Sequence, residues 1–541
     1  MANKLVVVAI LSGLGGVLAQ DDDGPGRGVA RISVINGDVS VKRGDSGDWT
    51  AAAVNAPLVV QDRVFTGPNS HAELQFDWAN MIRIASNSEV RLAELENRRY
   101  LVQVARGIVT FRVLRDSDAD AEISTPSVSV RPVKRGSYRV EVRDEGTVAI
   151  AVRSGEAEIF TTRGSERLKS GRTMLARGTA SDPEFQMVSD LPDDDWDRWN
   201  QRRDRDLERS NSYRYVSRDV YGADDLDPYG EWIHDPPYGW VWAPRVSVGW
   251  APYRLGRWAW VDWYGWTWVS YDPWGWAPYH YGRWYWGGRG WRWWPGGVYT
   301  RHYWRPALVA FFGWGGWGGV SVGVGFGRVG WCPLGPYEPY YPWYGRGYYG
   351  GFRNNNYNNI RVVNNINITN VYRNARVQNG ITTVDGNDFA VGRVSNIRTL
   401  NSGDLQRASL VQGQVPVTPG RDSLRLSDRD VTGRVSARAV NENSDRFYSR
   451  RQPAQVERVS FEEQRRGIEQ ASRRTFGEDN ARVAGGGLDR GAAREQTRGA
   501  EVRGEGSRGG GGVRGGEAAS AGEERGWRPA GESPRSEAGA T

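Results

Sequence analysis

Histidine, cysteine and paired acidic residues are the usual carriers of catalysis and metal binding, and this chain has few of them in regular patterns. Its 541 residues include one cysteine, Cys332, and four histidines at positions 71, 234, 280 and 302. Their spacings match no zinc motif, and the chain contains no Gly-x-Ser-x-Gly, phosphate-loop or His-Glu-x-x-His sequence. We therefore expect no metal, no cofactor and no catalytic residue. Cys332 is predicted to be a small buried side chain.

Two carboxylates keep one enzymatic alternative open. Asp262 and Asp272 lie in the tryptophan-rich part of the chain. Glycoside hydrolysis uses two carboxyl groups held roughly 5–10 Å apart beside the scissile bond. A carbohydrate-active enzyme would need this pair to line an aromatic cleft.

Tryptophan shows the most regular spacing. Gly-x-Trp triplets begin at Gly230, Gly256 and Gly282, which are 26 residues apart, and sixteen of the 26 tryptophans lie between Trp232 and Trp294. A fixed period indicates copies of one supersecondary unit. Repeated units form surfaces more readily than they form a single catalytic centre.

One repeat predicts a β-hairpin. Trp258 and Trp260 are two apart, as are Trp266 and Trp268, so each pair points to one face of a strand. The residues 262–265 between them can turn the chain. Three such hairpins in succession would form an up-and-down antiparallel sheet, which is more stable than a lone hairpin.

Two interpretations of these rings remain open: a buried core, or an exposed platform on which a ligand stacks. The core is assigned to the repeat positions Trp232, Trp258, Trp284, Trp240, Trp266 and Trp291. The platform is assigned to residues off the strict alternation, with two arginines at equivalent repeat positions: Trp263, Trp274, Trp294, Arg257 and Arg283. The arginines would stack on neighbouring rings or contact an anionic group.

Residues 28–180 carry a different β pattern. Apolar and polar residues alternate around Asn36-Gly37, a strong hairpin signal, and short alternating runs continue at roughly ten-residue spacing. This pattern predicts a β-sandwich or β-roll.

This part resembles the FecR-type periplasmic signalling domain. The resemblance rests on residues 37–41 (Gly-Asp-Val-Ser-Val), Trp49, 61–67 (Gln-Asp-Arg-Val-Phe-Thr-Gly), 72–74, 123–126 and 136–140. It implies a β-rich, non-catalytic domain for protein contact or sensing, which in that family passes a signal to a cytoplasmic sigma factor. The chain departs from the full regulator, because it shows neither a preceding anti-sigma segment nor a spanning helix.

The tryptophan-rich part, residues 213–345, resembles a bacterial domain of unknown function that often follows a FecR-like domain in exported proteins. The matching stretches are Tyr221-Gly222, 229–232, 238–244 and 249–252. The resemblance implies a real domain but no particular activity.

The remaining segments set the expected domain order. Residues 1–19 are predicted to be a secretory signal peptide, because their apolar run of about 14 residues is shorter than the roughly 20 that a membrane span needs. Residues 190–212 are predicted to be a helical linker. The Asn-rich residues 354–400 would extend a sheet or be loosely ordered. Residues 400–541, rich in Arg, Gly, Ser and Glu, are predicted to be largely disordered, with a short helix possible at 461–475.

These features predict a mainly β, exported, non-enzymatic protein in the periplasm or on the outer surface of a Gram-negative cell. Its FecR-like domain would contact a protein, and its aromatic module would bind an extended envelope polymer or an envelope protein. One rival hypothesis is an accessory role in a sigma-factor/anti-sigma system, with a membrane signalling protein as partner. The net charge of +7 is modest for this length, and with export it argues against a nucleic-acid partner.

Overall fold

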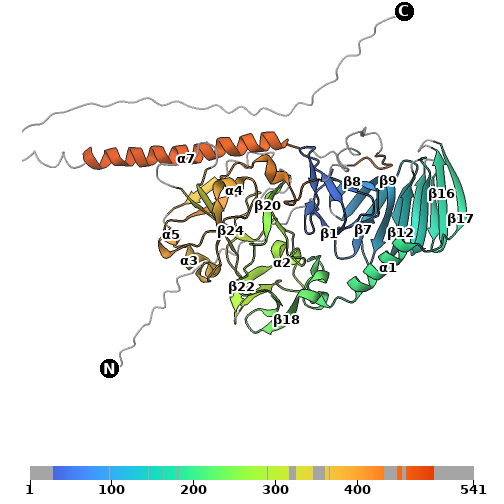
Figure 1. Cartoon of the computed structure of the whole chain (residues 1–541), viewed down its shortest axis with the longest axis horizontal. Coiled ribbons are helices and arrows are strands. Elements are labelled where there is room, and N and C mark those ends of the chain that lie inside the picture. The colour runs from blue at the N-terminus through green and yellow to red at the C-terminus, as the bar shows by residue number, and fades with distance from the viewer. Residues whose placement is uncertain are drawn as a thin grey trace, which may run out of the picture. The chain divides into compact units, whose positions relative to one another are not determined.

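The computed structural model describes residues 28–492, except for 97, 144, 162–163, 179–181, 289, 316–324, 345–359, 365, 432–446 and 454–457; side chains are described as far as residue 476. The predicted signal peptide and the end of the predicted tail lie outside these residues. The described chain up to Ala481 belongs to one compact unit. It is mainly β, as its sequence predicts (Figure 1).

The FecR-like part contains strands β1 to β17. They are β1 Ala30–Asn36, β2 Val39–Lys42, β3 Trp49–Ala51, β4 Pro57–Leu58, β5 Arg63–Thr66, β6 His71–Gln75, β7 Asn80–Ile84, β8 Glu89–Glu96, β9 Arg99–Val113, β10 Asp120–Ser124, β11 Ser129–Pro132, β12 Gly136–Val142, β13 Val148–Ser154, β14 Glu156–Thr161, β15 Gly164–Lys169, β16 Arg172–Gly178 and β17 Pro183–Ser189. The predicted Asn36-Gly37 turn joins β1 to β2, with Gly37 at φ 74°.

The long strand β9 belongs to two sheets. Its first half pairs with β8 and with the parallel strand β10, and its second half pairs with β7 and β12. Gly107, at φ 87°, lies where the pairing changes, a conformation that glycine adopts without a steric cost. The two sheets enclose a core of apolar residues that includes Ile32, Leu92 and Phe111.

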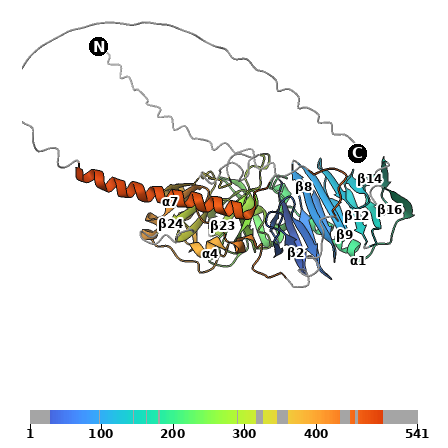
Figure 2. The ribbon, with the colours of Figure 1, turned by 90° about the horizontal axis from the view of Figure 1, so that it is seen from above.

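Helix α1, Asp195–Glu208, lies against the outer face of one of these sheets (Figures 1 and 2). Asp194 caps its N-terminus, and Asp197 completes the capping box, so two backbone donors of the first turn are satisfied. Arg83 of β7 and Arg112 of β9 form ion pairs with Asp204 of the helix. These contacts attach the helix to the sheet.

The tryptophan-rich part forms three hairpins. They are β18 Gly230–Asp235 with β19 Gly239–Pro244, β20 Gly256–Val261 with β21 Gly265–Ser270, and β22 Arg283–Gly287 with β23 Gly290–Trp294. The short helix α2, Ala277–His280, precedes the third hairpin. Trp258 is opposite Trp268 and Trp260 is opposite Trp266, so the two tryptophans of each strand share a face, as their spacing predicts.

The expected succession of hairpins in one sheet is wrong. Strand β19 pairs with β23, so the first and third hairpins form one sheet in the order β18-β19-β23-β22, and the second hairpin stands apart. Its outer backbone groups are used elsewhere: Trp258 N donates to Gly392 O at 3.0 Å, and Trp268 N donates to Pro306 O at 3.0 Å. These bonds occupy edges that would otherwise pair with neighbouring hairpins.

A five-stranded sheet unites segments that the sequence separates. Its order is β26-β28-β24-β25-β27, from β24 Val309–Trp314, β25 Arg328–Pro333, β26 Ile360–Val363, β27 Thr382–Asp385 and β28 Ser409–Gly413. The helices α3 Ile368–Val371, α4 Gly386–Ala390 and α5 Ser402–Gln406 lie between these strands in the chain. The Asn-rich segment thus contributes strands to the sheet.

The start of the predicted disordered tail at residue 400 needs correction. Strand β28 pairs with both β24 and β26, and the apolar side chains of Leu410, Val415, Val417 and Leu426 are buried. Sparse apolar residues suffice here because the sheet and the second hairpin supply the rest of the core. Helix α7, Phe461–Ala492, begins at the predicted position and is longer than expected. No helix among the described residues has both the length and the apolar character to cross a membrane.

Candidate functional site

Two of the three predicted platform tryptophans are buried. Trp263 is 8% exposed and Trp274 is 3% exposed. The ring of Trp263 lies 4.9 Å from the Arg458 guanidinium, and the ring of Trp274 lies 4.8 Å from that of Trp242. Departure from the alternation does not expose these rings, because other parts of the chain pack against both of them. The platform assignment of these two residues is therefore wrong.

Most, but not all, of the tryptophans predicted to form the core are buried. Trp258, Trp266, Trp284 and Trp291 are buried, and Trp232 is half-buried. Trp240 is 43% exposed, which corrects its core assignment. It lies at the first hairpin, where Tyr215 and His234 contact its ring at centroid distances of 4.7 and 5.5 Å. Repeats that are equivalent in sequence are packed against different neighbours.

The two repeat arginines differ from each other in their environment. Arg257 is 2% exposed, and its guanidinium donates to the carbonyls of Ser427 at 2.9 Å and Asp422 at 2.8 Å. It also pairs with Asp428 at 2.9 Å. Arg257 thus holds the segment after β28 against the second hairpin, which corrects its assignment to a ligand platform. Arg283 is half-buried and donates to Gly282 O at 3.0 Å.

The two candidate catalytic carboxylates do not line an open cleft. Asp262 and Asp272 are 2% and 6% exposed. Asp272 accepts a hydrogen bond from the Tyr279 hydroxyl at 2.6 Å, and its backbone carbonyl accepts one from Asn55 at 2.8 Å. A polymer has no access to carboxylates buried in this way, so the pair gives the carbohydrate-active alternative no support.

Asp262 belongs to a buried cluster of charged groups. Its Oδ1 accepts from Gln464 Nε2 at 3.1 Å, and its Oδ2 lies 3.4 Å from Arg458 Nε. Arg43, Asp45 and Asp62 of the FecR-like part complete the cluster, which thus holds three acids and two arginines. Burial, followed by the nearby Asp45 carboxylate, raises the pKa of Asp262 to about 7.

This raised pKa predicts a pH dependence of stability. The folded chain holds the Asp262 proton at pH values where the unfolded chain has lost it, so the free energy of unfolding falls as the pH rises from about 4 through 7. We expect Asp262→Asn to flatten this dependence and to be more stable than the unsubstituted protein at pH 8, by on the order of 1–3 kcal/mol. Urea unfolding between pH 5 and 8 measures both quantities. Asp206→Asn, at an exposed helix position, serves as the control, and parallel pH profiles for Asp262→Asn and the unsubstituted protein would contradict the assignment.

The described residues contain no group of three or more His, Cys, Asp and Glu side chains placed to hold a metal ion. Burial lowers the pKa of His280 to about 3, and its Nδ1 lies 2.7 Å from Arg305 O. Cys332 is buried, and burial raises the pKa of its thiol.

A row of partly exposed aromatic rings lies on the sheet of the first and third hairpins. We define the aromatic row as Tyr285, Tyr238, Trp294 and Tyr337. The Tyr238 ring contacts Tyr285 at 4.6 Å and Trp294 at 5.8 Å, and Trp294 contacts Tyr337 at 5.2 Å. Tyr337 is 76% exposed, and the other three rings are half-buried. Only Trp294 of this row is a platform residue predicted from the sequence.

Charged groups border the aromatic row. The Asp235 carboxylate accepts from the Tyr285 hydroxyl at 2.6 Å and from Arg292 at 2.7 Å. Arg373 donates to the Tyr238 hydroxyl at 3.4 Å. The strand register accounts for the shared face, because Tyr285 is opposite Arg292 and Arg283 is opposite Trp294. Tyr238 and Tyr337 lie in loops, so period-two reasoning could not find them.

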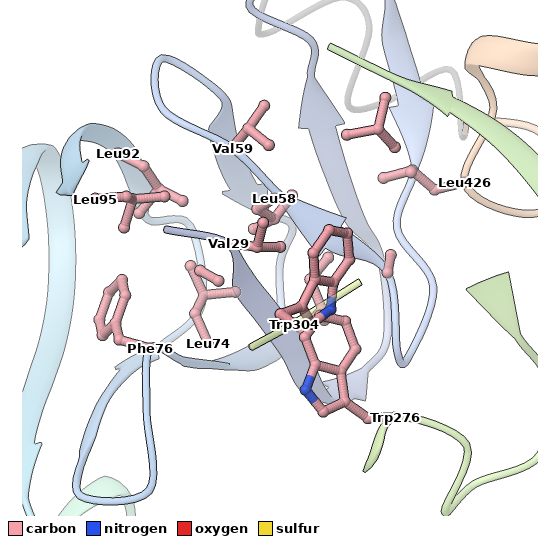
Figure 3. Close-up of a cluster of buried hydrophobic side chains, with 14 of the residues drawn as sticks. Val29, Leu58, Val59, Leu74, Phe76, Leu92, Leu95, Trp276, Trp304 and Leu426 are labelled. Carbon is pink, nitrogen blue, oxygen red and sulfur yellow. The ribbon is translucent and has the colours of Figure 1, made fainter. Parts of the chain in front are cut away.

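The FecR-like part and the tryptophan-rich part share a buried junction. Arg31 of β1 pairs with Asp225, and the Asn55 side chain donates to the carbonyl of Asp272. Figure 3 shows Val29 and Leu58 of the first part beside Trp276 and Trp304 of the second. All four side chains are buried in one apolar cluster. The aromatic row therefore belongs to a module that packs against the FecR-like domain through a buried interface.

Comparisons with known proteins agree with both resemblances. Residues 62–158 match the family model described as FecR protein, and residues 223–338 match a family of unknown function, DUF6600. The recognition of a FecR-type domain followed by a tryptophan-rich domain of unknown function is thus confirmed.

Among solved structures, the chain is similar to two crystal structures, at 1.65 and 2.50 Å resolution, of a "putative anti-sigma factor" from Parabacteroides distasonis ATCC 8503. Sequence identity is 18% and 19%, the TM-score is 0.21 for each, and each match covers 24% of this chain and 59% of the other. No curated protein matches the chain.

Proposed function

We propose that this chain is a non-enzymatic interaction protein of the cell envelope. Its FecR-like domain contacts a protein, and its tryptophan-rich module binds an extended polymer through the aromatic row. The predicted signal peptide supports export to the periplasm or to the outer surface of a Gram-negative cell. The match of residues 62–158 to the FecR family supports a role related to envelope signalling.

The observation that carries the polymer-binding proposal is the aromatic row itself. Its rings touch one another on the solvent side of a sheet, and the ion pair Asp235–Arg292 and the Arg373 side chain border them. Ring faces stack on flat apolar surfaces, and the neighbouring charged groups supply hydrogen bonds that fix orientation. A polysaccharide offers both kinds of surface along its length, and a row of rings can contact several of its units together.

Alanine substitutions in the row test this proposal. We expect Trp294→Ala and Tyr337→Ala in the full chain each to weaken binding to peptidoglycan or to an envelope polysaccharide by roughly tenfold. The guide is the about 1–3 kcal/mol that an aromatic ring contributes when it stacks on a base. Co-sedimentation with insoluble peptidoglycan, and calorimetric titration with soluble polysaccharides, measure the affinity.

Trp286→Ala is the matched control. Trp286 lies on β22 next to Tyr285, is 46% exposed, and points to the opposite face of the sheet because neighbouring strand residues alternate. This variant should bind as the unsubstituted protein does. Equal affinity of all three variants for every polymer tested, or failure of the unsubstituted protein to bind any of them, would contradict polymer binding by the row.

A signalling role remains the second candidate, and the FecR match favours it. In this alternative the FecR-like domain contacts a membrane signalling protein, and the tryptophan-rich module senses the ligand. Deletion of the encoding gene would then change the activity of an envelope-stress sigma factor. An unchanged transcript profile in the deletion strain would argue against this alternative.

A further inference from the structure

A short segment near the C-terminus lies across the FecR-like domain. We call residues 447–451, Phe-Tyr-Ser-Arg-Arg, the C-terminal segment. Arg450 pairs with Glu122 at 2.9 Å, and Arg451 pairs with Glu94 at 2.9 Å and with Asp120 at 2.8 Å. The partners lie more than 320 positions earlier in the chain. The segment thus packs against a domain formed by the N-terminal part of the described chain.

Aromatic contacts extend these ion pairs. The Phe447 ring lies 4.7 Å from the guanidinium of Arg63 and 5.9 Å from that of Arg91. At the other end of the contact, the Arg450 guanidinium lies 4.1 Å from the Phe160 ring. Cations over ring faces are attracted by the ring quadrupole.

The strand register shows that the segment crosses the strands along a single row. One chain of directly paired residues joins β5, β8, β9, β10, β11 and β14: Arg63, Arg91, Gln103, Ser124, Ser129 and Phe160. Paired residues lie on the same face of a sheet. Phe447 contacts the first two residues of this row, the Tyr448 carbonyl accepts from Gln103 at 3.2 Å, and Arg450 covers the last.

The acids below the segment are each paired with one of its arginines. The side chains of Glu122 and Glu94 are 2% and 5% exposed. A buried carboxylate is costly unless it is paired and hydrogen-bonded. Within the domain, Glu122 accepts a hydrogen bond from the Ser124 hydroxyl at 3.2 Å, and Glu94 forms an ion pair with the exposed Arg99 at 3.1 Å. The C-terminal segment adds one guanidinium to each.

This contact differs in kind from the junction with the tryptophan-rich part. Besides its polar contacts, the junction contains a cluster of fully buried apolar side chains such as Leu58 and Trp276. The C-terminal segment binds mainly through charged and aromatic side chains, and Arg450 remains 47% exposed. Polar, partly hydrated contacts of this kind are typical of interfaces that exchange partners.

We infer that this face of the FecR-like domain is a peptide-recognition site for a basic segment of the form Phe-x-x-Arg-Arg, and that the C-terminal segment occupies it in cis. A partner protein with the same pattern of an aromatic residue and two arginines competes for the site. Tethering gives the cis segment an effective concentration on the order of mM, so only a partner that is abundant or binds more tightly displaces it. The inference concerns the FecR-like domain alone and is independent of the aromatic row.

The test uses the full chain and a labelled synthetic peptide with the sequence of residues 445–453. The triple variant Phe447→Ala, Arg450→Glu, Arg451→Glu removes the cis ligand but keeps the domain residues. We expect fluorescence anisotropy to show saturable binding of the peptide to this variant. Binding to the unsubstituted protein should be about 100-fold weaker or more, because the tethered segment competes.

Two controls separate recognition from general charge attraction. Arg407→Glu reverses a single arginine charge at a residue that is 73% exposed and pairs with Asp404 three positions away, and it should leave peptide affinity at the level of the unsubstituted protein. A peptide with both arginines replaced by lysine should bind the triple variant several-fold more weakly, because lysine lacks the planar guanidinium that stacks on Phe160. Circular dichroism would verify that the triple variant is folded.

Two results would overturn the inference. One is equal affinity of the peptide for the unsubstituted protein and for the triple variant. The other is equal affinity of the triple variant for the natural peptide and for a peptide with both arginines replaced by glutamate.

Discussion

Replacement of Trp258 by alanine should lower the free energy of unfolding by about 3–5 kcal/mol, the usual cost of truncating a large buried aromatic residue. Trp258 is fully buried, and its ring contacts those of Phe311, Trp268 and Trp331 at centroid distances of 5.0, 5.4 and 5.5 Å. These neighbours come from the second hairpin and from two strands of the five-stranded sheet. The substitution therefore opens a cavity where several elements meet.

Urea unfolding followed by circular dichroism measures this effect. Trp286→Ala is the matched control, since that ring is 46% exposed, and its unfolding free energy should change by no more than about 0.5 kcal/mol. Trp258→Phe should fall between the two, because phenylalanine fills part of the space. A Trp258→Ala midpoint equal to that of Trp286→Ala would show that Trp258 is not part of the core.

The second large effect is expected at Glu73 of β6. Its carboxylate is buried and pairs with Arg83 at 2.7 Å and with Arg203 of helix α1 at 2.9 Å, and it accepts from the Ser33 hydroxyl at 2.8 Å. Removal of one partner of a buried ion pair typically costs about 3–5 kcal/mol, because a charge is left without compensation. We expect Glu73→Ala to lie at the lower end of this range, since Asp204 still pairs with Arg83.

The comparison for Glu73→Ala is Glu208→Ala. Glu208 also joins helix α1 to the FecR-like domain, but its pair with Arg135 at 2.9 Å is exposed on both sides, so its loss should cost about 1 kcal/mol or less. Thermal unfolding of both variants gives the difference, and hydrogen exchange of α1 reports whether the helix detaches. A Glu73→Ala effect no larger than that of Glu208→Ala would contradict the role of this pair.

Glu73 and Asp262 act in opposite pH directions. Burial alone would raise the pKa of Glu73, but Arg203 and Arg83 hold it well below its usual value. Its contribution is therefore present above about pH 4.5 and is lost as the pH falls below that value. Asp262, with its raised pKa, destabilises the fold as the pH rises toward 7. Together the two groups favour maximum stability at mildly acidic pH.

Local sequence patterns predicted the individual hairpins well. The shared face of Trp258 and Trp260, and that of Trp266 and Trp268, follows from period-two spacing. The three-residue turn at 262–264, which sets the pairing of Trp258 with Trp268, is explained by Gly265 and by Trp263 in the left-handed region, at φ 66° and 67°. The FecR-like motifs identified the first domain for the same reason, because they reflect strands and turns close together in the chain. Both kinds of signal depend on a residue and its near neighbours.

The candidate sites were predicted less well. Of the predicted platform tryptophans, only Trp294 belongs to the exposed aromatic row, whereas Trp263 and Trp274 are covered by distant segments. The row also needs Tyr238 and Tyr337, which are 99 positions apart, on either side of Trp294. Nothing in the repeat indicates which ring faces solvent, because exposure depends on what packs against each hairpin.

The sequence by itself determined the β character, the three hairpins and the two domain types, since alternation and turn residues act over a few positions. Only the tertiary structure decided the sheet order β18-β19-β23-β22, the inclusion of β28 in a sheet, and the course of the C-terminal segment over the FecR-like domain. These features depend on contacts between residues that are 50 to more than 300 positions apart. Burial and charge pairing at such separations are set by the whole fold, so a local sequence pattern does not predict them.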